Sequence, residues 1–198
     1  MTRPQPDIHL TRHRSLALAP IRLACLLWPL LMAPGASAQA PPAYNCDGTP
    51  SHRQFDFWLG YWQVTDKPGT TVYGENRISK RDKGCVLLEE YASVQSFTGT
   101  SINYYNPADK LWHQHWVDNG TSIIHTAGGL KGESMVMEGT IYYLAQQRSA
   151  PFRARWTPLQ DGRVQQFFEE QDGTGQWNTW FDGYYQRLDP PVSTDTSR

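Results

Sequence analysis

Residues 111–144 read LWHQHWVDNGTSIIHTAGGLKGESMVMEGTIYYL, and this stretch carries the clearest signal for the fold. Segments rich in aromatic and β-branched residues alternate in it with two short turn signals, Asn119-Gly120 and Lys131-Gly132. Glycine supplies the positive φ angle that tight hairpin turns require, and the flanking residue types favour extended strands. The stretch therefore predicts three antiparallel strands joined by two hairpins, over Leu111–Val117, Ser122–Gly129 and Ser134–Leu144.

The length of the first turn decides which side chains share a face. Residues two apart in a strand point the same way, so the two tryptophans of the first strand lie on one face with Gln114. A two-residue turn would pair Gln114 with His125 and set that histidine beside the tryptophans. A three-residue turn, residues 119–121, would pair Trp116 with Ile124 and Gln114 with Thr126.

The second hairpin selects between these registers. We expect it to pair Thr126 with Met137 and Gly128 with Met135. With the three-residue turn, the tryptophans, the isoleucine and both methionines form one apolar face across three strands, and a one-residue slip would break that row. We therefore predict the three-residue turn, with His113, His115 and His125 pointing outward.

The same texture extends in both directions along the chain, from Tyr61 to Arg187, and helical character is limited to a short turn at Phe55–Leu59. About ten successive antiparallel strands suggest a meander that buries its edges by closing on itself. The predicted fold is all-β, a single antiparallel up-and-down β-barrel of about 8–10 strands, with an open sandwich as the alternative. The remaining strands are expected near Tyr61–Thr65, Thr71–Ile78, Gly84–Val94, Gly99–Tyr105, Phe152–Trp156, Arg163–Glu170 and Gln176–Arg187.

Composition excludes several classes of protein. The 198 residues are 39% hydrophobic and 13% aromatic, with a formal net charge of −1. A disordered chain is poor in aromatic residues and high in net charge, so wholesale disorder is excluded. The near-neutral charge offers no basic surface, so we predict no nucleic-acid partner.

The first 38 residues have the layout of a secretory signal peptide. An arginine-rich segment precedes the apolar run Leu23–Met32, and the small residues Ala36-Ser37-Ala38 follow it. The run is about half of the roughly 20 residues that a membrane-spanning helix needs. We predict a signal peptide over residues 1–38, export to the periplasm or the extracellular space, and no membrane span after cleavage.

Cleavage after Ala38 would leave two cysteines, Cys46 and Cys85. Two cysteines in an exported protein most simply form one disulfide, which here would tie the N-terminal segment to the third strand. The expected domain organisation is an extended leader over residues 39–53, the barrel over residues 54–188 and a disordered tail over residues 189–198.

The segment FDFWLGYW, residues 55–62, resembles the opening of lipocalin-like (calycin) barrels, in which a short helical turn leads into Gly-x-Trp on the first strand. More closely, the chain resembles an uncharacterised family of exported bacterial proteins with an F-D-F-W-L-G-x-W motif. The resemblance implies a fold and a compartment but no activity. In such barrels an arginine of the last strand stacks on the Gly-x-Trp tryptophan, which implies a contact between Arg187 and Trp62. The other segments that carry the resemblance are residues 74–78, 84–89, 101–105, 112–118, 155–164 and 180–184.

Alternation along the predicted strands gives a set of inward-facing residues in which amides, one carboxylate and tyrosines are scattered among aromatic rings. Such a lining suits a cavity that packs an apolar molecule and orients it with a few hydrogen bonds. The predicted function is binding of a small apolar or aromatic ligand in the barrel lumen. The predicted ligand-binding residues are Asn76, Glu89, Tyr91, Asn103, Tyr105, Trp112, Gln114, Trp116 and Gln166.

Two other functions stay open. A small-molecule hydrolase, lyase or isomerase could use Glu89 as acid or base, with Glu169 or Asp182 as a second carboxylate for glycoside hydrolysis. A barrel with a filled lumen could instead act through its outer surface. The sequence designates no catalytic residue.

Metal and cofactor chemistry find little support. His113-Gln114-His115 has the spacing of two metal ligands, but the predicted register brings no third ligand to it, so no metal site is predicted. The sequence contains no phosphate-binding loop, dinucleotide fingerprint or haem-attachment motif, so no cofactor is predicted.

Overall fold

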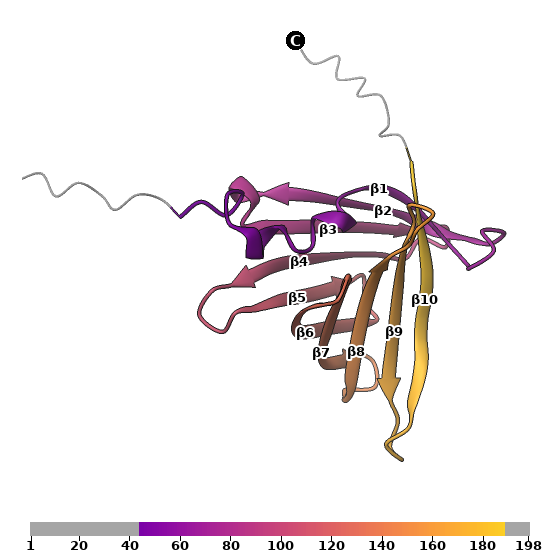
Figure 1. The fold of residues 1–198 in the computed structure, drawn as a ribbon. Helices are drawn as coiled ribbons and strands as arrows, with labels where there is room; N and C mark the ends of the chain where they lie inside the picture. The colour runs from indigo at the N-terminus through magenta and orange to yellow at the C-terminus, as the bar shows by residue number, and fades with distance from the viewer. Residues whose placement is uncertain (1–43, 189–198) are drawn as a thin grey trace, which may run out of the picture. The chain divides into compact units, whose positions relative to one another are not determined.

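The structure of the chain is a computed structural model that describes residues 44–188. The predicted signal peptide, the start of the leader and the C-terminal tail lie outside the described residues. Ten antiparallel strands follow one another in sequence order, and the first pairs with the last to close a barrel (Figure 1). The predicted closed antiparallel barrel is confirmed. Its strands are β1 (Gly60–Thr65), β2 (Val72–Arg81), β3 (Val86–Ser93), β4 (Thr98–Asn106), β5 (Leu111–Asp118), β6 (Ser122–Lys131), β7 (Ser134–Tyr143), β8 (Arg148–Pro158), β9 (Val164–Gln171) and β10 (Trp177–Arg187).

The hairpin between β5 and β6 has the predicted three-residue turn. Trp116 pairs with Ile124 and Gln114 with Thr126. The reason is local, because the Asp118 carboxylate accepts hydrogen bonds from the backbone N–H of Thr121 at 2.6 Å and of Ser122 at 2.9 Å. One side chain thereby satisfies the amides that the turn leaves unpaired, much as an Asx turn does.

The register expected for β6 and β7 was wrong by two residues. Gly128 pairs with Met137, and Leu130 pairs with Met135. Pairing continues as far as Lys131 and Ser134, so the turn consists of Gly132 and Glu133 alone, with Gly132 at a φ of 62°. A shift of two residues preserves the faces, and both methionines are fully buried as expected.

Three 3-10 turns are present where one was expected: η1 (Pro50–Arg53), η2 (Asp56–Trp58) and η3 (Asp82–Gly84). The first two form a plug, because the rings of Phe55 and Trp58 are fully buried inside one end of the barrel. The Phe55 ring lies 5.6 Å from that of Trp112 on β5 and 5.2 Å from that of Trp156 on β8. The plug therefore contacts two separate strands of the wall and fills this end of the lumen.

The contact implied for the first and last strands is confirmed. The Arg187 guanidinium lies 4.3 Å from the Trp62 ring centroid, and the two residues are directly paired between β1 and β10. Arg187 also donates to the Leu59 carbonyl at 3.1 Å, while the Trp62 indole donates to the Trp58 carbonyl at 2.9 Å. Barrel closure and the plug are thus joined through one stacked pair.

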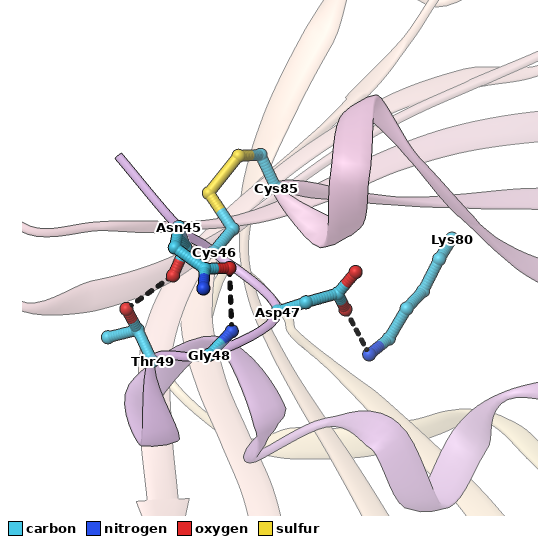
Figure 2. Close-up of a disulfide and its surroundings, with 7 residues drawn as sticks. All are labelled: Asn45, Cys46, Asp47, Gly48, Thr49, Lys80 and Cys85. Atoms are coloured by element: carbon cyan, nitrogen blue, oxygen red, sulfur yellow. Dashed lines mark hydrogen bonds and ion pairs between the residues drawn. A yellow bond between two sulfur atoms is a disulfide. The ribbon is translucent and has the colours of Figure 1, made fainter. Parts of the chain in front are cut away.

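The predicted disulfide is also confirmed. Cys46 is bonded to Cys85, which lies in the turn before β3 rather than within that strand (Figure 2). Beside the disulfide, Lys80 on β2 pairs with Asp47 at 2.8 Å and with Asp56 of the plug at 3.2 Å. The plug segment is therefore tied to the β2–β3 end of the barrel by one covalent bond and a pair of ionic contacts.

Truncating the stacked arginine tests the closure. We expect Arg187→Ala to lower the free energy of unfolding by about 1 kcal/mol, because the cation–π contact with Trp62 and the bond to Leu59 are both lost. The neighbouring Gln186 is exposed, so Gln186→Ala should change stability by less than about 0.5 kcal/mol. Urea unfolding measures both, and equal effects of the two changes would contradict the assigned role.

Removal of the disulfide tests the attachment of the plug. The two cysteines are 39 residues apart, so losing the cross-link from the unfolded chain should cost about 3–4 kcal/mol of stability. The double variant Cys46→Ala/Cys85→Ala and the reduced wild-type protein should show the same loss in urea unfolding. A reduced protein as stable as the oxidised one would contradict this expectation.

Candidate functional site

A cavity of about 120 Å³ lies in the half of the lumen that the plug does not reach. Strand β5 runs from one end of the barrel to the other. Trp112 lies near its start and Trp116 near its end, so the two side chains lie toward different ends of the lumen. Trp112 packs on the plug and Trp116 lines the cavity. The residues around the cavity are Glu89, Tyr91, Phe97, Gln114, Trp116, Ile124, Gln166, Phe168, Trp180, Phe181 and Tyr185.

Glu89 forms the polar floor of the cavity. Its side chain on β3 is buried and accepts a hydrogen bond from the Asn76 amide of β2 at 2.7 Å and another from the Ser101 hydroxyl of β4 at 2.6 Å. Asn103 supports this pair from behind by donating to the Ser101 hydroxyl at 2.8 Å. Both neighbours of β3 therefore hold the carboxyl group in one orientation.

A second set of polar contacts joins the floor to the far wall. Asn76 also donates to the Tyr185 hydroxyl of β10 at 3.1 Å, and that hydroxyl donates to the Gln166 side-chain oxygen of β9. The network thus runs from β4 through β3 and β2 to β10 and β9. The other members of the network are amides and hydroxyl groups, so Glu89 is its one carboxyl group.

Burial raises the pKa of Glu89 to about 7, and the hydrogen bonds from Ser101 and Asn76 only partly oppose the shift. A carboxylate is stabilised by a positive neighbour, and the partners of Glu89 among residues 44–188 are the neutral side chains of Ser101 and Asn76. The same burial, together with the nearby Glu89, raises the pKa of Tyr91 to about 12 and that of Tyr185 well above its usual value. Both tyrosines are therefore neutral around pH 7.

One polar group in the wall has unused hydrogen-bonding capacity. Gln114 is buried as a residue and lines the cavity, yet its side-chain amide makes no hydrogen bond to any other residue of the range 44–188. Its polar atoms are not among the fully enclosed unpaired atoms, which include Asn76 Oδ1 and Asn103 Oδ1, so they are accessible from the cavity. Gln114 faces the cavity, so a bound molecule or water is the partner that could satisfy it.

The outer wall of the cavity consists of aromatic rings that reach the surface, where Trp180 is 36% exposed. A β-bulge between Thr179 and Phe181 breaks the alternation of β10, so that the consecutive residues Trp180 and Phe181 both line the cavity. Gly99 on β4 makes room for the Trp116 indole, since a Cβ atom at position 99 would lie 2.1 Å from that ring.

Five of the nine residues predicted to bind a ligand line this cavity: Glu89, Tyr91, Gln114, Trp116 and Gln166. Asn76 and Asn103 lie behind it, where they hold Glu89 and Ser101.

The remaining two predicted residues lie at the other end of the barrel and do not line the cavity. The Trp112 indole donates to the Ser51 carbonyl at 3.1 Å, and the Tyr105 ring lies 5.1 Å from that of His52. They face inward as expected, but the plug occupies the lumen in front of them.

Sequence reasoning missed several residues of the outer wall. Phe97 precedes β4, and Trp180 is the extra residue of the bulge, so strand alternation gives no facing for either. Composition is the signal that could have indicated these lining residues, because Phe97, Trp180 and Phe181 are aromatic residues near the turns at one end of the barrel.

The other chemical candidates lie outside the lumen. Glu169 pairs with Arg153 at 2.6 Å, and Asp182 accepts from Gln165 at 2.7 Å, so neither faces Glu89 across the cavity. The rings of His115 and His125 lie 4.4 Å apart on the face of β5 and β6 opposite to Gln114. Within residues 44–188, no group of three or more histidine, cysteine, aspartate or glutamate side chains is placed to hold a metal ion.

Comparison with known proteins does not assign the chain to a family. No protein-family model and no curated protein matches the sequence. In the part of the chain that the structure describes, no helix is long and apolar enough to cross a membrane.

The raised pKa of Glu89 predicts a pH dependence of stability. Between its ordinary value of 4.5 and the folded value of about 7, the folded protein binds more protons than the unfolded chain. The contribution of Glu89 is complete below pH 4.5 and is lost as the pH rises through 7, by roughly 3 kcal/mol in total. Urea unfolding from pH 4.5 to 8 should show this decline in the wild type and in Glu90→Gln, whose side chain is exposed, but not in Glu89→Gln. An identical slope in all three proteins would contradict the assignment.

Proposed function

We propose that the barrel binds a small molecule with a largely apolar or aromatic body in the cavity at its unplugged end. The observation that carries this proposal is the division of the cavity wall. Aromatic rings form the outer part, and three polar side chains, Glu89, Gln114 and Gln166, converge at the inner part. An apolar cavity with a few converging polar groups is the usual composition of a small-molecule site.

The size of the cavity limits the ligand. Drug-sized sites measure roughly 300–1,000 Å³, whereas a cavity of about 150 Å³ in another protein binds benzene. A volume of about 120 Å³ is therefore suited to a single ring or a short branched chain, with any longer part of the molecule passing between the rings at the surface.

We propose further that the protein is exported and works in the periplasm or outside the cell. The disulfide supports this, because such bonds persist in oxidising compartments. The signal-peptide pattern of residues 1–38 and the resemblance to a family of exported bacterial barrels point the same way. We also propose, on the resemblance of residues 55–62, that the barrel is related to the lipocalin-like barrels.

Ligand release tests the binding function. Small molecules freed by mild denaturation of the purified protein would be identified by mass spectrometry, then added back while tryptophan fluorescence is recorded. Trp116 and Trp180 line the cavity, so an occupant should change the emission. A protein that releases nothing and whose fluorescence ignores a broad panel of single-ring compounds would contradict the proposal.

A cavity-filling variant provides a matched comparison. Ile124 lines the cavity, whereas Ile123 is its neighbour on the opposite face of β6. We expect Ile124→Phe to weaken binding of a compound identified in that panel by at least tenfold, since the larger ring takes up the space, and Ile123→Phe to leave it unchanged. Equal affinity of the two variants, measured by calorimetry, would place the ligand elsewhere.

A second candidate function is acid–base catalysis by Glu89. The observation in its favour is the carboxyl group at the cavity floor, whose pKa of about 7 suits proton transfer near neutral pH. Turnover of a bound neutral compound that disappears in Glu89→Gln, while binding of the same compound persists, would support catalysis. Recovery of every bound compound chemically unchanged from the wild type would argue against it.

A further inference from the structure

We propose that the natural ligand is a small organic cation, such as a primary amine, whose ammonium group lies against Glu89 while its hydrocarbon body packs among the aromatic rings. This inference rests on the proposed function and names the chemical class of ligand for the same cavity. Three features of the wall support it: an acid without a counter-charge, a wall of aromatic rings, and the absence of any basic side chain from the lining within residues 44–188.

The first feature is the uncompensated carboxyl group. Its hydrogen-bond donors, Asn76 and Ser101, are neutral, and each occupies one of the two oxygens. An ionised carboxylate can accept about four hydrogen bonds, so each oxygen has room for another donor. Since burying a charge without a partner is costly, a cation that enters the cavity removes a penalty that the empty protein carries.

The second feature is the aromatic outer wall, which includes the indoles of Trp116 and Trp180 and the ring of Phe181. The faces of aromatic rings are electrically negative, and they attract ammonium groups by about 0.5–2 kcal/mol for each well-placed pair. A cation that has lost water in the cavity can therefore be stabilised by the rings that turn a face toward it. A carboxylate or phosphate ligand would find neither a basic side chain nor a favourable ring face.

The third feature is that no basic side chain of the described range is among the groups that surround Glu89. Apart from its hydrogen-bond donors on β2 and β4, these are Tyr91 of β3, Gln114 of β5, Gln166 of β9 and Tyr185 of β10. The tyrosines are neutral below about pH 9, because their pKa values are raised. Glu89 is consequently the one group around the floor whose charge changes between pH 6 and 8.

Isothermal titration calorimetry on the purified protein tests the ligand class with pairs that differ only in the head group. Benzylamine is compared with benzyl alcohol, and n-butylamine with butan-1-ol, at pH 8. Each pair has the same hydrocarbon body, so the ratio of affinities reports the preference for a cation. We expect the amines to bind at least tenfold more tightly than the alcohols.

The pH dependence gives a second readout that needs no variant. Benzylamine stays protonated throughout, while Glu89 takes up a proton as the pH falls. Its affinity should therefore be about tenfold lower at pH 6 than at pH 8, with proton release on binding near pH 7, whereas benzyl alcohol should show no such loss. The reverse trend, with amines favoured at low pH, would overturn the proposal.

Variants locate the effect. Glu89→Gln keeps a similar shape and should abolish the preference for amines over alcohols, whereas Glu90→Gln removes an exposed charge one residue away and should retain it. Near-UV circular dichroism checks that both variants are folded.

The possible results separate the two levels of the proposal. Alcohols that bind as tightly as amines to the wild type would overturn the cation and leave the binding function intact. A wild-type protein that binds neither head group with either hydrocarbon body would overturn the cation proposal. The ligand-release experiment then shows whether the cavity binds any small molecule at all.

Discussion

Pairing of the first strand with the last is the constraint on which the molecule depends. Ten strands of a meander would leave two long edges open, and a sheet of this size removes them by closing. Arg187 stacked on Trp62 marks this closure, and the same pair is bonded to the plug through the carbonyls of Leu59 and Trp58. The contacts that close the sheet therefore also hold the plug in place.

The plug then divides the lumen into two halves. Phe55 and Trp58 occupy one end, where they pack on Trp112 and Trp156, and the disulfide to Cys85 ties their segment to the wall. Since that half is filled, a cavity can form only beyond it. Glu89 lines this cavity, so its carboxyl group borders the unfilled part of the lumen although the residue is buried.

Burial of Glu89 places stability and function in opposition. Above pH 7 the folded protein carries a buried carboxylate held by two neutral donors, and this weakens the fold relative to a protonated or amide side chain. Functional groups are often retained at such a cost to stability. In a binding protein the same buried charge provides specificity, because it attracts a ligand of opposite charge and does not attract neutral analogues in this way.

The sequence alone determined the features that depend on local chemistry. The residue types of the strands and the glycine-containing turns determined the meander. The apolar row of Trp116, Ile124 and the two methionines determined the three-residue turn, since a one-residue slip would break that row. Alternation then placed Glu89, Gln114, Trp116 and Gln166 inward, because the two-residue repeat of a strand is independent of its partners.

Only the tertiary structure decided what those inward residues face. Trp112 and Trp116 have the same chemistry and the same facing in the sequence, yet the plug covers one and leaves the other bordering the cavity. The bulge that turns both Trp180 and Phe181 toward the cavity is likewise a property of pairing between β9 and β10. The volume of the cavity and the lack of a counter-charge for Glu89 arise where five strands and the segment before β4 meet in space, and no local pattern encodes them.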